Sequence, residues 1–138
     1  MNLDAKIAHL GFIQGVITRM GSNSFLLKSW SLTLVTALFA LSSKDADPRF
    51  VELAFLPVIF FWLLDTFFLH QERLFRKLYQ EVAADRIPAE GFSMDTSSVR
   101  KDVPSSIRVA FSRTLLAFHG PMLFVILVAL LFLRSRCR

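Results

Sequence analysis

Three long runs of apolar residues restrict what this sequence can fold into. They cover residues 25–43, 50–69 and 115–133, and polar segments separate them. At about 1.5 Å per helical residue, a run of roughly 20 residues just crosses a hydrocarbon layer of about 30 Å. The chain has only 138 residues, of which 54% are hydrophobic, and a soluble domain of that size has too little interior to bury them. The sequence therefore predicts an all-α integral membrane protein.

The segment before the first run predicts a separate helix. In residues 1–24 the apolar positions recur at helical spacing and polar ones fall opposite, which is typical of an amphipathic helix at the cytosolic surface. Gly11 and Gly15 either admit a close helical neighbour or are simply tolerated. The polar residues 21–24 then predict a break before the first span.

The connections between the runs predict their arrangement. A short polar turn, residues 43–49, forces the second run back beside the first, so residues 25–69 predict an antiparallel transmembrane hairpin. Pro57 predicts a tolerated kink in the second span. Residues 70–106 predict a cytosolic helical extension with i,i+4 charge pairs, followed by a loop rich in Pro, Ser and Thr.

The last segment, residues 107–138, predicts a short interfacial helix and a C-terminal span. Gly120 and Pro121 predict a bend in that span. The segment either crosses the membrane fully or turns back within it, because the tail from Arg134 onward holds three arginines.

The distribution of basic residues predicts the orientation. With three spans, the N-terminus and the loop from residue 71 to 113 share one side of the membrane and carry eleven Lys and Arg, while the other side carries five. Cytoplasmic segments carry the excess of positive charge. The sequence therefore predicts a multi-pass membrane protein with a cytoplasmic N-terminus. A re-entrant third segment would bring the arginine tail to the cytoplasm as well.

Asp65 is a charged residue inside the second apolar run. An ionised carboxylate is costly at that depth, and the antiparallel hairpin puts Lys28 at a similar level. We expect a Lys28–Asp65 ion pair, within one chain or between neighbouring chains. Such a pair fixes the register of the hairpin; the alternatives are a role in an ion pathway and simple exposure to interfacial water.

The first span carries small and hydroxylated residues at helical spacing. They share one face, which indicates either close helix packing or the wall of a wet pore. Both interpretations require a protein neighbour, so we expect a homo-oligomer. The residues of this hydroxyl stripe are Ser29, Thr33, Thr36, Ala40 and Ser43.

Basic side chains beside the spans are expected to contact membrane lipid or a partner protein. Five residues form this set: Arg73, Arg76, Lys77, Arg108 and Arg113. The loop 92–98 either docks a partner as an extended segment or is a solvated connector.

The sequence holds no signature of catalysis. It has no Gly-rich phosphate loop, no cluster with metal-ligand spacing and no plausible Ser–His–Asp set. We therefore expect no enzyme activity, no catalytic residue, no cofactor and no metal. The single cysteine, Cys137, excludes an internal disulfide. It is expected to be an inert thiol, with an intermolecular disulfide or a lipid as the alternatives.

The histidines are the remaining candidates for chemistry. Arg113 and His119 match the Arg-x4–6-His pattern of HEPN ribonucleases, but the pattern runs into a predicted span where RNA has no access. We expect His119 to be a helix-kink residue with a polar partner, and no direct contact with nucleic acid. His9 and His70 are expected to make polar contacts at the membrane interface.

Three stretches carry a resemblance to a family. The sequences HLGFIQGVI (9–17), NSFLLKSWS (23–31) and QERLFRKLY (71–79) resemble a family of small uncharacterised bacterial membrane proteins. The build, a membrane hairpin with cytosolic helical extensions, is similar to that of membrane effectors of bacterial anti-phage systems.

This second resemblance implies a homo-oligomeric inner-membrane effector or channel-like protein that permeabilises or depolarises the membrane. The chain has no recognisable nucleotide-binding domain, so a separate cytosolic sensor or partner protein would have to signal to it. The alternatives are a non-conducting scaffold that recruits a soluble partner and a membrane-embedded enzyme that depends on His119 or His70.

Overall fold

The computed structural model describes residues 3–45 and 48–136, and all regular structure in them is helical. Three of the helices are long and apolar enough to cross a membrane. These findings confirm the predicted all-helical class and the three long apolar helices. In chain order the elements are α1 (Leu3–Asp45), α2 (Pro48–Leu53), α3 (Phe55–Ala83), the 3-10 helix η1 (Ser97–Asp102), α4 (Ser106–Ala110) and α5 (Arg113–Arg136).

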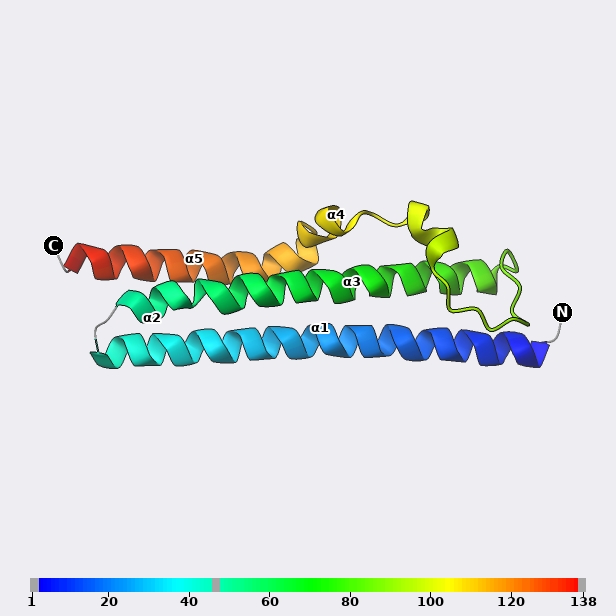
Figure 1. The fold of residues 1–138 in the computed structure, drawn as a ribbon, viewed down its shortest axis with the longest axis horizontal. Coiled ribbons are helices and arrows are strands. Elements are labelled where there is room, and N and C mark those ends of the chain that lie inside the picture. Colours follow the sequence, from blue (N-terminus) through cyan, green and yellow to red (C-terminus); the bar gives the residue numbers. More distant parts are fainter. Residues whose placement is uncertain (1–2, 46–47, 137–138) are drawn as a thin grey trace.

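The long helices lie side by side along one axis (Figure 1). α1 spans the length of the molecule, and the chain reverses after it so that α2 and α3 return beside it. α5 lies against α2 and the first part of α3, and α4 lies beside the middle of α3. η1 and the segments around it cover the second part of α3. The molecule therefore has a three-helix end, where α1, α2–α3 and α5 pack together, and a two-helix end that the loop covers.

Each end has its own apolar core. In the three-helix end the buried residues are Val35, Val51, Ala54, Val58, Met122, Ile126 and Leu130. In the two-helix end they are Ile13, Ile17, Leu78, Val82, Ala89 and Val99.

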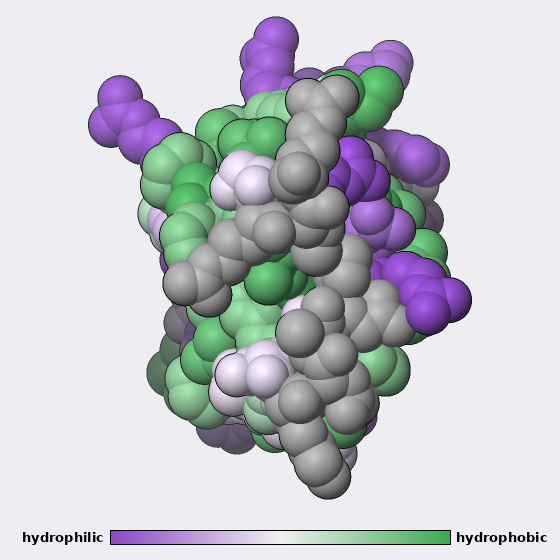
Figure 2. Space-filling model, turned by 90° about the vertical axis from the view of Figure 1, so that its left-hand side faces the viewer, coloured by the Kyte–Doolittle hydropathy of each residue, from purple (hydrophilic) through white to green (hydrophobic). Residues whose placement is uncertain are grey.

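The outer surface of the three-helix end is also apolar. Figure 2 looks onto this end and shows hydrophobic residues over much of the surface in view, with hydrophilic side chains projecting at its rim. Water-soluble monomers rarely expose large apolar patches. The large side chains that are more than half exposed there include Phe25, Trp30, Leu56, Phe60, Leu63, Phe67, Phe124, Leu131 and Phe132.

The predicted break at residues 21–24 is wrong, because α1 continues through it. The hydroxyl of Ser24 does not cap a new helix; it donates a hydrogen bond to Asp65 of α3. Both halves of α1 pack against α3, and a straight helix satisfies both sets of contacts. The N-terminal amphipathic segment and the first apolar run are therefore one helix.

The second run is interrupted at Ala54, between α2 and α3, three residues before Pro57. A proline ring meets the carbonyl of the residue four positions earlier, here Leu53 at the end of α2, so the interruption lies where Pro57 is expected to bend the chain. Pro121 lies inside α5 without ending it. The separation from the short α4 falls earlier, at Phe111 and Ser112.

The loop after α3 packs onto the N-terminal part of α1. Lys6 Nζ donates to the carbonyl oxygen of Ala83 at 2.8 Å and lies 2.7 Å from Oδ1 of Asp85. The rings of Phe12 and Phe92 are 6.0 Å apart. The first part of the 92–98 segment therefore contacts α1, although Phe92 and Ser93 remain exposed on their outer side.

The Gly11 and Gly15 face of α1 has no close helical neighbour in the part of the chain that the structure describes, because a side chain at either position would meet nothing within 4 Å. Cys137 lies outside the described residues.

The continuity of α1 can be tested at Gly21. A Cβ there would lie in ordinary contact distance, 3.8 Å from Oε2 of Glu72, so Gly21→Ala adds helix propensity without a clash. We expect it to raise the free energy of unfolding by about 1 kcal/mol and Gly21→Pro to lower it by about 3 kcal/mol. Thermal unfolding in detergent, followed by circular dichroism, measures both changes. A destabilised Ala variant would contradict a continuous helix at this position.

Candidate functional site

A buried polar cluster separates the two apolar cores. Its centre is the carboxylate of Asp65 on α3, which is fully buried. Nζ of Lys28 lies 2.5 Å from Oδ2 of Asp65, so the structure brings together the two residues predicted as an ion pair. Ser24 Oγ donates to Oδ1 of the same carboxylate, and Lys28 Nζ also donates to Ser24 Oγ at 2.7 Å.

The third long helix completes the cluster. Nε2 of His119, on α5, lies 3.2 Å from Oδ2 of Asp65, and the His119 side chain is fully buried. The Trp62 ring stacks on the imidazole with centroids 5.7 Å apart and planes 7° from parallel. Trp62 Nε1 in turn donates to the carbonyl oxygen of Ala110 at 3.0 Å. The predicted polar partner of His119 is thus Asp65.

Helical spacing explains why these side chains converge. Ser24 and Lys28 are four residues apart on α1 and therefore share a face. Asp65 projects from the facing turn of α3, and Trp62 lies three residues before it. His119 is in the second turn of α5, where that helix begins to pack against the other two. The cluster is the level at which all three long helices meet.

The cluster stabilises a charge and does not assemble a catalytic set. Asp65 receives hydrogen bonds from Ser24, Lys28 and His119. Both of its carboxylate oxygens therefore have the partners that a buried charge needs. Ser24 donates to the carboxylate and His119 contacts the same carboxylate, so no His–Ser pair is formed for nucleophilic attack. The described residues hold no group of three potential metal ligands among His, Cys, Asp and Glu.

One polar atom of the cluster has no partner. Nδ1 of His119 is buried and makes no hydrogen bond within the described part of the chain. RNA has no access to this ring, because Trp62 covers its face and Asp65 holds its other nitrogen. The geometry therefore does not support the ribonuclease interpretation of the Arg113–His119 spacing.

The hydroxyl stripe of α1 faces outward. Ser29, Thr33 and Thr36 are exposed, and each hydroxyl donates to the carbonyl oxygen four residues earlier in its own helix. Ser43 is exposed as well. Thr36 also lines an apolar hollow of about 420 Å³ between α1 and α5. No described part of this chain packs over the stripe as a whole.

A second set of hydroxyls on α1 faces inward and was not among the residues predicted from the sequence. Ser24, Ser31 and Ser42 are buried, and Ser31 Oγ lies 3.5 Å from the sulfur of Met122 on α5. Together with Lys28 and Val35 they follow the same helical spacing as the outward stripe. Their register with Lys28 is the signal that could have identified the packed face.

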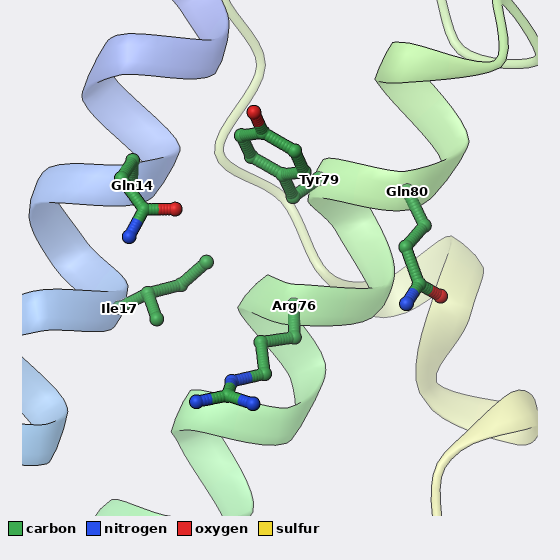
Figure 3. Close-up of a pocket in the computed structure, with 5 residues that line it drawn as sticks. All are labelled: Gln14, Ile17, Arg76, Tyr79 and Gln80. Carbon is green, nitrogen blue, oxygen red and sulfur yellow. The ribbon is translucent and has the colours of Figure 1, made fainter.

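The predicted basic contacts divide into paired and unpaired side chains. Arg76 lies 2.7 Å from Glu72, and Lys77 lies 2.9 Å from Glu81, as the i,i+4 spacing predicted. Arg76 also lines a hollow of about 250 Å³ in which Gln14 and Ile17 of α1 face α3 (Figure 3).

The other three arginines of this set lie around the junction of the two ends. Arg108 and Arg113 are exposed and Arg73 is half-buried. None of the three forms a salt bridge within residues 3–45 and 48–136.

The two remaining histidines are inside the protein. His9 is fully buried and its Nε2 lies 2.9 Å from the carbonyl oxygen of Ser93, so it fastens the loop to α1. His70 is 8% exposed and follows the apolar part of α3. Both positions are more enclosed than an interfacial contact.

Comparison with known proteins adds no assignment: no family model, curated protein or solved structure matches this chain.

Removing one member of the ion pair should be much worse than removing both. Asp65→Leu leaves the ammonium of Lys28 without its partner, and we expect a loss of about 3–5 kcal/mol in unfolding free energy. The double variant Lys28→Met with Asp65→Leu should recover most of that loss, because two apolar side chains replace the buried pair. Unfolding in detergent by denaturant measures the cycle.

The exposed Glu52–Arg134 pair, with 2.6 Å between Oε1 and Nη2, is the control for this cycle. Glu52→Gln should change stability by less than about 1 kcal/mol. Equal losses for Asp65→Leu and the double variant would show that Lys28 and Asp65 do not depend on each other.

Proposed function

We propose that this protein is inserted in a membrane through its three-helix end and acts there as a channel-like homo-oligomer. Insertion is supported by the three long apolar helices and by the exposed aromatic and aliphatic side chains around them. α1 has 43 residues, or about 65 Å at 1.5 Å per residue, twice the hydrocarbon thickness of about 30 Å. Its N-terminal half, the second half of α3 and the loop therefore project from the membrane together.

The outward hydroxyl stripe on α1 is the observation that carries the oligomer. Ser29, Thr33 and Thr36 lie among large exposed apolar residues, yet no described part of the chain covers them. Small hydroxylated residues on one face let helices approach closely or line a hydrated path. The interior of each chain is filled by its own core and by the Asp65 cluster. A conducting path would therefore lie between subunits, with α1 as its wall.

The projecting two-helix end supplies the means of control. It has its own core and is joined rigidly to the membrane part, because α1 and α3 run through both. A displacement at this end is therefore transmitted to the α1 stripe. On this basis we propose an effector of the inner membrane, N-terminus in the cytoplasm, that permeabilises or depolarises the membrane when a cytosolic partner binds. Its place in anti-phage defence rests on the resemblance of build alone.

Cysteine cross-linking tests the position of the subunit interface. In a Cys137→Ser background, Thr33→Cys should give disulfide-linked dimers in membranes, because the stripe of one subunit faces that of the next. Leu63→Cys, on the exposed face of α3, is the matched control and should stay monomeric. Liposome flux then tests conduction: Thr33→Val with Thr36→Val keeps the side-chain shape but removes the hydroxyls, and should abolish ion flux. Cross-links at Leu63 but not at Thr33 would refute the interface.

A non-conducting scaffold is the second candidate, and the exposed charges of the projecting end favour it. Arg76 and Lys77 are consecutive residues of α3, and Arg76 remains 64% exposed although it is paired with Glu72. A soluble acidic partner could bind there without any pore.

Charge reversal separates the two functions. If the protein is a scaffold, Arg73→Glu with Arg76→Glu should abolish biological activity, while Thr33→Val with Thr36→Val leaves it unchanged. If the protein is a channel, Thr33→Val with Thr36→Val should abolish the activity. Growth or membrane potential of cells that express each variant is the measurement, with immunoblots of the membrane fraction to confirm equal insertion.

A further inference from the structure

One face of α3 borders two adjoining hollows of opposite character. The first, of about 310 Å³, lies between α3 and α4 and is lined almost entirely by apolar side chains such as Ile59, Leu63 and Phe111. The second, of about 420 Å³, lies further along α3 beneath the loop and η1. The hollows adjoin, because Thr66 lines the first and its neighbour Phe67 lines the second.

The second hollow holds an arginine that has no salt-bridge partner in the described part of the chain. Arg100 lines it, is exposed, and has no salt bridge among the residues that the structure describes. Arg73 lies close enough to His70, another lining residue, to act on its charge together with Arg100. Arg100 and the nearby Arg73 outnumber the carboxylate in the lining, Asp95, so the hollow favours an anionic occupant.

Asp95 is the acidic side chain in this lining, and it is turned to the loop. Its Oδ1 accepts from the backbone N–H of Ser97 at 2.9 Å and its Oδ2 from the Ser97 hydroxyl at 2.6 Å. These two hydrogen bonds lower the pKa of Asp95, so it is ionised at neutral pH. It forms no salt bridge with Arg100, whose guanidinium stays available.

The apolar hollow lies on the apolar surface of the molecule, and the charged hollow lies where that surface ends. The apolar groove runs along the exposed apolar surface of α3, where Leu63 and Phe67 are more than half exposed. The charged hollow begins at the end of that surface, at His70. Ile107 of α4, which is 75% exposed, forms part of the groove wall at this boundary. An elongated molecule with one charged and one apolar end fits the pair of hollows in a single direction.

We infer that the two hollows form a binding site for one anionic phospholipid, with the headgroup phosphodiester at Arg100 and His70 and an acyl chain in the groove between α3 and α4. Basic hollows beside membrane helices on the cytoplasmic side are suited to such headgroups. The inference rests on the proposed membrane insertion. It adds a specific lipid, and it assigns Arg100 a role that the exposed Lys101 beside it does not share, since Lys101 does not line the hollow.

Quenching of Trp62 fluorescence tests the site, because Trp62 lines the apolar groove. The chain has two tryptophans, so Trp30→Phe leaves Trp62 as the single reporter. The full chain is reconstituted in phosphatidylcholine vesicles that contain a small fraction of either acyl-brominated phosphatidylglycerol or acyl-brominated phosphatidylcholine. We expect stronger quenching by the anionic lipid at equal mole fraction. Arg100→Gln should weaken its apparent affinity about tenfold, the effect of losing one charge-assisted hydrogen bond, and Lys101→Gln should leave it unchanged.

The outcomes distinguish the site from its alternatives. Equal quenching by both brominated lipids overturns the site, and so does an equal loss in Arg100→Gln and Lys101→Gln, which would show general surface charge. Addition of inorganic phosphate to the vesicles should leave the quenching by brominated phosphatidylglycerol unchanged. If phosphate displaces that lipid completely at millimolar concentration, the occupant is a free phosphate and the lipid assignment is wrong.

Flotation of the same vesicles reports insertion separately. Protein that floats but shows no lipid preference overturns this inference alone, whereas protein that does not float overturns the proposed function as well.

Discussion

The fold depends on how the buried carboxylate of Asp65 is satisfied. A charge removed from water is stable only if opposite charge and hydrogen-bond donors surround it. Here three side chains from two helices supply the donors: Ser24 and Lys28 from α1, and His119 from α5. Because each donor belongs to a different turn, the carboxylate sets both the register of α1 against α3 and the level at which α5 joins them. A slip of one helical turn, about 5.4 Å, would leave both the carboxylate and the ammonium unpaired.

The cluster also divides the molecule into two parts with different surfaces. On one side the core of Val35, Val58 and Ile126 is enclosed by helices whose outer surfaces are apolar too. On the other, the core of Ile13, Leu78 and Val99 lies beneath charged surface pairs such as Glu72–Arg76. The N-terminal half of α1 has no third long helix beside it, and the loop takes that place through Lys6 and His9. One continuous pair of helices thus joins both parts without a hinge.

The sequence predicted the long elements and the central ion pair, and the reasons are local. Apolar runs of sufficient length predict helices, and a short turn between two runs leaves only an antiparallel return, which places Lys28 opposite Asp65. The contribution of His119 could not be predicted, because it depends on where α5 begins after a long loop. Periodicity found the hydroxyl stripe of α1 but could not say which face is packed. The expected break at Gly21 failed because long-range packing outweighs the weak helix propensity of one glycine.

Trp62 connects the buried cluster with the surface of the three-helix end. One face of its indole stacks on His119, and its N–H donates to the carbonyl oxygen of Ala110 in α4. The same side chain lines the apolar groove between α3 and α4. Any group that fills the groove therefore touches the residue that holds His119 against Asp65. Since Asp65 also holds Lys28 of α1, the exposed apolar side of α3 is linked to α1 through adjacent side-chain contacts, and not through a distant rearrangement.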